Sequence, residues 1–197
     1  MIRALLVASA ASLLVPSPVA PASLPLVVIQ PGAIEQVICY GSQGIWAGTA
    51  FRVGPSGLGA SVNHVTSTGG ACEIGGKPMN LAYKSPTRDF SEVLLDDGPY
   101  ISIDCGGFVK GKRYLAIGYA RGEPNLYTVE MTGKGQTNQN ESLLTGMLVV
   151  VPGMSGGPVI DEETGRVVGT VNMEDFEDGY SWSVPLSDTP LCKKPLA

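Results

Sequence analysis

The sequence predicts an all-β domain, and three observations carry this prediction. Short runs of apolar, β-branched or aromatic residues recur along the chain, clusters of Gly, Pro, Asn and Asp separate them, and no long segment keeps a helical period. Runs spaced by about 8–12 residues are typical of β-sandwiches and β-barrels. The 26 Gly and 15 Pro residues supply the turns that so many short strands need.

Eleven runs are expected to form strands. In chain order they are Glu35–Tyr40, Ile45–Val53, Leu58–Val62, Met79–Tyr83, Phe90–Leu95, Tyr114–Tyr119, Leu126–Met131, Met147–Val151, Pro158–Ile160, Val167–Asn172 and Ser181–Val184. One short helical turn is expected at Asn63–Thr66. The polar stretch Thr132–Ser142 is expected to be an exposed loop.

The charge balance excludes one broad class of partner. The chain has 197 residues with 13 basic and 18 acidic side chains, giving a net charge of −5. An acidic chain without a basic face is not expected to bind nucleic acid. Its length suits a single domain that buries its own core, and no internal repeat or interdomain linker is visible.

The N-terminus has the pattern of a secretory signal peptide. Arg3 precedes the apolar run Ala4–Val15, which is too short to cross about 30 Å of hydrocarbon as a helix. Ala20-Pro21-Ala22 fits the small-x-small cleavage pattern. We therefore expect residues 1–22 to be removed and residues 23–197 to form an exported domain, secreted or periplasmic, without stable membrane insertion. An uncleaved membrane anchor is the alternative.

Export would place the four cysteines of the chain in an oxidising compartment. Cys39, Cys72, Cys105 and Cys192 are widely spaced, with no C-x-x-C pair and only one histidine in the chain. This pattern does not fit a zinc site, so we expect no metal. In an oxidising compartment the cysteines are expected to form two disulfides, and four cysteines allow three pairings.

One group of residues suggests nucleophilic catalysis. Ser155 lies in the glycine-rich loop Gly153–Pro158, where its hydroxyl and the neighbouring backbone amides can approach a carbonyl. A serine hydroxyl needs a neighbouring base, and the only imidazole is that of His64. The base in turn needs a carboxylate to orient it, and Asp89 opens an apolar strand in a suitable position.

The sequence offers two alternatives to this assignment. Asp96, Asp97 and Asp104 are the other candidate acids, but Asp96-Asp97-Gly98-Pro99 is typical of a turn. Gly153-Met154-Ser155-Gly156-Gly157 also matches the G-x-S-x-G pattern of α/β-hydrolase esterases. The all-β pattern and the position of the histidine before the serine exclude that fold.

Together, in the order His–Asp–Ser, these residues resemble the trypsin-like serine proteases of the chymotrypsin fold, and in particular the compact bacterial high-temperature-requirement proteases. The resemblance runs from about Gly48 to Pro185. It rests on Gly48-Thr49-Ala50-Phe51, the strand after Asp89, and the segments 111–119, 152–160 and 165–171. The family usually has small residues before its histidine, where this chain has Val62-Asn63.

The resemblance implies two antiparallel six-stranded β-barrels with the active site in the cleft between them. The first barrel would span about residues 34–103 and the second about 104–187. His64 and Asp89 would come from the first barrel and Ser155 from the second, with the N–H groups of Gly153 and Ser155 as the oxyanion hole. Barrel membership also suggests the disulfides Cys72–Cys105 and Cys39–Cys192.

The same resemblance suggests where a substrate would bind. The segment Val171, Asn172 and Met173 would form one wall of the primary pocket and pair with the substrate backbone. Val149 would form the pocket floor. Trypsin has an aspartate there, so the valine favours a small or medium apolar side chain at the cleaved position.

The expected function is therefore an exported serine endopeptidase that acts on polypeptides. It needs no cofactor in this interpretation. The alternative is a catalytically inactive binding protein with a protease fold. The sequence gives no indication of the oligomeric state.

Overall fold

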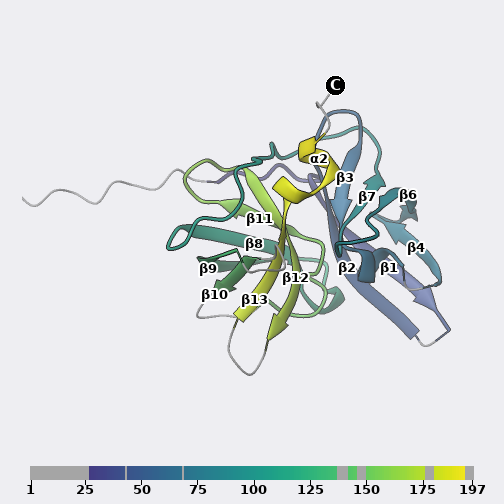
Figure 1. The fold of residues 1–197 in the computed structure, drawn as a ribbon. Helices are drawn as coiled ribbons and strands as arrows, with labels where there is room; N and C mark the ends of the chain where they lie inside the picture. The colour runs from purple at the N-terminus through teal and green to yellow at the C-terminus, as the bar shows by residue number, and fades with distance from the viewer. Residues whose placement is uncertain are drawn as a thin grey trace, which may run out of the picture.

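The computed structural model describes residues 27–42, 44–67, 69–136, 142–145, 150–175 and 180–193. Strands predominate and form two antiparallel sheets, which confirms the all-β fold class. Figure 1 shows the earlier strands on one side of the molecule and β8–β13 on the other. The expected signal peptide at residues 1–22 lies outside the described residues, as does the 147–149 part of the expected Met147–Val151 strand.

The first sheet has seven strands in the spatial order β5-β4-β1-β2-β3-β7-β6. Their bounds are β1 Ile34–Gly41, β2 Gly44–Arg52, β3 Leu58–Ser61, β4 Ala71–Ile74, β5 Lys77–Pro78, β6 Asn80–Lys84 and β7 Ser91–Leu94. Val37 and Cys39 of β1 are buried on one face, as expected for a strand with a single covered side. A four-residue helix, α1 (Asn63–Thr66), follows β3 where the helical turn was expected.

The second sheet is a closed barrel of six strands in the order β10-β13-β12-β11-β8-β9. Its strands are β8 Arg113–Tyr119, β9 Leu126–Gln136, β10 Ser142–Thr145, β11 Pro158–Asp161, β12 Val167–Asp175 and β13 Tyr180–Pro185. Three short helices flank them: η1 Ala120–Gly122, η2 Leu186–Asp188 and α2 Pro190–Lys193. Among the described ranges no helix is long and apolar enough to cross a membrane.

The expected loop at Thr132–Ser142 is partly wrong, because β9 continues to Gln136. Thr132 pairs with Arg113 of β8 on one side and with Thr145 of β10 on the other. The strand keeps its alternation of buried and exposed residues, since Met131 and Gly133 are buried while Thr132 is exposed. Because the buried position 133 holds a glycine and not a large apolar residue, the sequence does not show this alternation. Residues 137–141 lie outside the described part of the chain.

One core cluster joins the two sheets. Phe51 and Phe90 from the first half pack with Ile117 and Ile160 of the barrel, and all four are buried. Leu191 of α2 belongs to the same cluster, so the C-terminal segment covers the joint between the sheets. Burial of this joint fixes the loops of the two sheets relative to each other.

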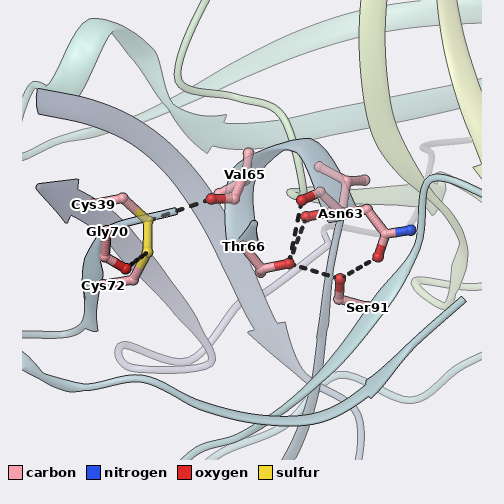
Figure 2. Close-up of a disulfide and its surroundings, with 8 residues drawn as sticks. Cys39, Asn63, Val65, Thr66, Gly70, Cys72 and Ser91 are labelled. Atoms are coloured by element: carbon pink, nitrogen blue, oxygen red, sulfur yellow. Dashed lines mark hydrogen bonds between the residues drawn. A yellow bond between two sulfur atoms is a disulfide. The ribbon is translucent and has the colours of Figure 1, made fainter. Parts of the chain in front are cut away.

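The expected disulfide pairing is wrong. The disulfides are Cys39–Cys72 and Cys105–Cys192. Strand β4 returns beside β1 and places Cys72 directly opposite Cys39, with the two Cα atoms 4.0 Å apart. Opposed positions on neighbouring strands are within bonding distance, whereas sharing a barrel is not enough to pair two cysteines. Figure 2 shows this bond beside α1.

Candidate active site

The loop that carries Ser155 is built on two glycines with left-handed backbone angles. Gly153 has φ +96° and Gly156 has φ +87°. A Cβ at Gly153 would lie 2.4 Å from the carbonyl oxygen of Tyr119, and one at Gly156 would lie 2.2 Å from that of Thr49. Neither separation is sterically allowed, so the loop needs glycine at both positions both for its angles and for close packing.

Thr49 of β2 holds this loop from the first sheet. Its backbone N–H donates to the Ser155 carbonyl at 2.9 Å, and its Oγ1 donates to the Gly153 carbonyl at 2.8 Å. The same Oγ1 accepts a hydrogen bond from the backbone N–H of Tyr119 at 3.0 Å. Thr49 is fully buried. One threonine therefore ties together the first sheet, the serine loop and the end of β8.

The backbone N–H groups of Gly153 and Ser155 have no hydrogen-bond acceptor within the described residues. The carbonyl of Pro152 accepts a hydrogen bond from the N–H of Arg121 at 2.6 Å. In a trans peptide the C=O and N–H point in opposite directions, so this bond fixes the direction of the Gly153 N–H.

His64 and Asp89 are joined by two hydrogen bonds. Nδ1 of His64 lies 2.5 Å from Oδ2 of Asp89, and the His64 backbone N–H donates to Oδ1 at 2.9 Å. Asp89 lies in the loop before β7, while His64 is on α1. The His64 side chain is 47% exposed, so part of the imidazole is accessible from outside.

The charge of Asp89 is stabilised in this position. Burial opposes the charge and is the largest single influence, raising the pKa of Asp89. The hydrogen bonds and charge of His64, with the backbone N–H of Asn63, act in the other direction and prevail. The pKa of Asp89 is therefore lower than its ordinary value of 3.8, and the carboxylate is ionised at neutral pH.

Ser155 lies where the two sheets meet, but its hydroxyl does not face His64. Oγ of Ser155 donates to the backbone carbonyl of Asn172 at 3.0 Å. Within the described residues, no hydrogen bond joins this hydroxyl to His64. The segments that carry the two residues do meet, because Ser61, three residues before His64, approaches the Gly156 position. Catalytic hydrogen bonds are often absent or long in unliganded enzymes.

The expected pocket wall is only partly described. Val171 and Asn172 are buried on β12, and Val171 pairs with the serine loop through Gly156 and Gly157. Asn172 falls at a register shift between β12 and β13, and within the described chain its buried Oδ1 has no hydrogen-bond partner. The backbone of Met173 pairs with Trp182. The side chain of Met173 and the whole of Val149 lie outside the described part.

Two of the three competing acids have partners away from His64. Asp96 pairs with Lys77, and Asp104 accepts a hydrogen bond from the N–H of Gly106 at 2.8 Å. Asp97 is exposed beside Asp96. Within the described residues no three His, Cys, Asp or Glu side chains are grouped so that they could hold a metal ion.

Comparison with known proteins identifies the family. A family model described as a trypsin-like peptidase domain matches residues 48–169, well over half of the chain. The chain belongs to this family. By family it is a serine endopeptidase, a class of hydrolases that act on polypeptides. None of the curated proteins searched matches the sequence.

Solved protease structures share the fold of this peptidase. The active form of the Rv3671c protease from M. tuberculosis is 16% identical with a TM-score of 0.70, covering 84% of this chain and 83% of that one. A serine endoprotease from Yersinia pestis is 17% identical with a TM-score of 0.66, covering 79% and 59%. The HtrA-type protease AlgW with a tripeptide is 20% identical with a TM-score of 0.63, covering 82% and 57%.

The sequence does not reveal the role of Thr49 in this site, although Thr49 belongs to the Gly48-Thr49-Ala50-Phe51 motif. The contacts of Thr49 reach residues about 100 positions away. Only the docking of the two sheets brings those partners together, so no local pattern could have revealed the role.

Proposed function

We propose that this peptidase is exported and cleaves peptide bonds with a triad of Ser155, His64 and Asp89 and an oxyanion hole formed by the N–H groups of Gly153 and Ser155. The observation that carries the proposal is the pair of hydrogen bonds between His64 and Asp89. They belong to an exposed imidazole that faces an ionised carboxylate. This is the arrangement that a general base needs.

The hydrogen bond to Asp89 determines which nitrogen of His64 can act as the base. The carboxylate is only an acceptor, so Nδ1 carries the proton and Nε2 keeps its lone pair. Nε2 can then accept the proton of Ser155. The hydroxyl must first turn away from the Asn172 carbonyl, which it contacts in the resting state.

The reaction then runs in two halves. Oγ of Ser155 bonds to the substrate carbonyl carbon, the carbonyl electron pair moves to its oxygen, and His64 holds the proton. Collapse breaks the C–N bond as His64 passes that proton to the leaving amine. Water then repeats the sequence on the acyl-enzyme and releases the carboxylate.

The free amides of the serine loop suit the intermediate of this reaction. The N–H groups of Gly153 and Ser155 make no hydrogen bond to the described chain, and they can donate to the negative oxygen. Each such donor contributes about 3 to 4 kcal/mol of transition-state stabilisation. The Arg121–Pro152 bond fixes the Gly153 donor before substrate arrives. This preorganisation avoids a reorientation cost during the reaction.

The binding and export parts of the proposal rest on fewer observations. The Asn172 carbonyl and the register shift at this residue leave a backbone acceptor for an extended substrate. The valine at the position expected for the pocket floor, Val149, supports a small or medium apolar residue at the cleaved position. Residues 1–22 and the two disulfides support export to an oxidising compartment.

Labelling with a fluorophosphonate tests the proposed machinery before a substrate is known. The probe reacts with an activated serine, and intact mass reports the adduct. We expect one adduct on the wild type and none on Ser155→Ala or His64→Ala. Once a substrate is found, Ser155→Ala should lower kcat by about 10⁶-fold.

One observation favours the alternative of an inactive binding protein, because the Ser155 hydroxyl faces Asn172 rather than His64. In that case the folded wild type would give no adduct and would still bind peptides. The labelling experiment therefore separates the two candidates. A wild type that labels no faster than Ser155→Ala would refute the triad.

A further inference from the structure

Asn63 connects the two segments that carry His64 and Asp89. It is the first residue of α1 and immediately precedes His64. Its side-chain nitrogen Nδ2 donates to the carbonyl of Ser85 at 2.9 Å and to that of Arg88 at 2.7 Å. The second acceptor is the carbonyl of the residue directly before Asp89. The Asn63 amide therefore holds the backbone that leads into the carboxylate.

The other end of the amide is also fixed. Oδ1 of Asn63 accepts a hydrogen bond from Oγ of Ser91 at 2.7 Å, and Ser91 is fully buried on β7. Because Oδ1 can only accept, the single Ser91 proton points to it, and Thr66 must donate in the 2.7 Å contact with Ser91. Figure 2 shows this relay, in which Ser91 lies between Thr66 and Asn63 of α1. The bond from Ser91 therefore sets which way the amide faces, with Oδ1 toward Ser91 and Nδ2 toward the two carbonyls.

The loop that Asn63 holds is not part of a strand. Residues 85–90 lie between β6 and β7, and Oγ of Ser85 accepts hydrogen bonds from the N–H groups of Thr87 and Arg88. These local bonds shape the turn, but they do not attach it to α1. Attachment to α1 comes from the Asn63 side chain and from Asp89 itself.

We propose that Asn63 is a positioning residue, which holds the Asp89 loop against α1 so that the carboxylate meets Nδ1 of His64. The inference rests on the proposed function and deepens it. A small apolar residue at this position would leave the Ser85 and Arg88 carbonyls without this donor. We call the two Nδ2 hydrogen bonds to these carbonyls the brace, which a small apolar residue could not provide.

The test uses Asn63→Ala, which removes the brace, and Asn63→Asp, which keeps the acceptor for Ser91 but turns the donor into an acceptor. His64 is the only histidine, so imidazole signals in NMR spectra of the ¹⁵N-histidine-labelled protein belong to it without further assignment. We expect both variants to lose or broaden the Nδ1–H signal of the bond to Asp89. The rate of fluorophosphonate labelling should fall by about 10-fold to 100-fold.

Two controls separate positioning from general loosening. Thr66→Val removes the relay to Ser91 and leaves both Nδ2 bonds of Asn63, so it should lower stability while keeping the Nδ1–H signal and the labelling rate. Asn80→Asp makes the charge change of Asn63→Asp at an exposed position on β6. It should leave both readouts unchanged.

The outcomes decide the proposal in either case. Loss of the Nδ1–H signal in the Asn63 variants but not in Thr66→Val supports it. An unchanged signal in a folded Asn63 variant, or equal losses in Thr66→Val, overturns it. The signal does not depend on catalysis. A wild type that fails to label would refute the proposed function, while the NMR comparison would still decide the role of Asn63.

Discussion

Asp89 combines a structural and an electrostatic role in one side chain. One oxygen fixes the backbone of His64 and the other faces its ring. The folded state therefore favours the ionised form, although burial opposes it. A carboxyl group whose pKa is lower in the folded state than in the unfolded state binds fewer protons after folding. Its contribution to stability is thus present above the unfolded pKa and is lost as the pH falls through the folded one.

This linkage predicts how Asp89→Asn changes the pH dependence of stability. The wild type should unfold with a higher free energy than the variant at pH 7. The difference should shrink as the pH falls below the ordinary value of 3.8, because both proteins then carry a neutral group. Urea titrations at several pH values measure this difference in the free energy of unfolding. Asp97→Asn, an exposed aspartate near the same sheet, controls for the loss of one charge; a difference that stays constant from pH 7 to 3 would contradict the prediction.

The serine loop is an element that needs support from outside as well as its own turn bonds, which run from the Met154 N–H to the Val151 carbonyl and from the Gly157 N–H to the Met154 carbonyl. Its turns depend on Thr49 from the first sheet and on Arg121 from η1, whose own φ is +53°. A non-glycine residue with such an angle is uncommon and indicates a constrained turn. The two bonds act on the successive peptide groups Pro152–Gly153 and Gly153–Met154, so together they set the directions of the N–H groups of Gly153 and Met154.

Thr49→Val tests this constraint, since valine keeps the shape and removes the hydroxyl. The buried Gly153 carbonyl loses its donor and the Tyr119 N–H loses its acceptor. We expect a loss of stability of about 1 to 3 kcal/mol, together with slower fluorophosphonate labelling. Thr49→Ser retains the hydroxyl and should label close to the wild-type rate. Normal labelling by Thr49→Val would mean that the hydroxyl does not shape the loop.

The sequence predicted elements well where apolar alternation was clear and poorly where glycine replaced an apolar residue. The runs around Phe51, Ile117 and Val168 lie in strands, and Asn63–Thr66 forms its helical turn. The end of β9 was missed because Gly133 occupies an inward position. The disulfides were mispaired because β4, which places Cys72 beside Cys39, has no distinct pattern. The His64–Asp89 contact came from the family pattern, but the bracing by Asn63 depends on loop geometry that the sequence does not reveal.

In the whole molecule, two halves distant in sequence are joined by a shared core and by the C-terminal segment. Phe51 and Ile160 belong to the same cluster as Leu191 of α2. The guanidinium of Arg88, the residue before Asp89, has its Nη2 atom 3.8 Å from Oδ2 of Asp188 in η2. The bond from Cys105 to Cys192 closes this arrangement, since it ties the connection between the sheets to α2. The C-terminal segment thus contacts both halves beside the candidate site.

Replacement of Cys105 and Cys192 by alanine should therefore destabilise the protein mainly through the unfolded chain. The bond closes a loop with a sequence separation of 87. Cys105 is exposed, so the packing that is lost is confined to Cys192, which is half-buried against the core cluster at the joint. Loop-closure entropy predicts a loss of about 3 to 5 kcal/mol in the free energy of unfolding.

The matched variant without Cys39 and Cys72 opens a loop of separation 33, which costs about 1 kcal/mol less in entropy. That variant also loses the packing of two buried sulfurs, which offsets its smaller entropic loss. Denaturant titrations should therefore give the two variants similar losses in the free energy of unfolding. A loss below about 1 kcal/mol for the Cys105 and Cys192 variant would show that the unfolded chain is already compact without the bond.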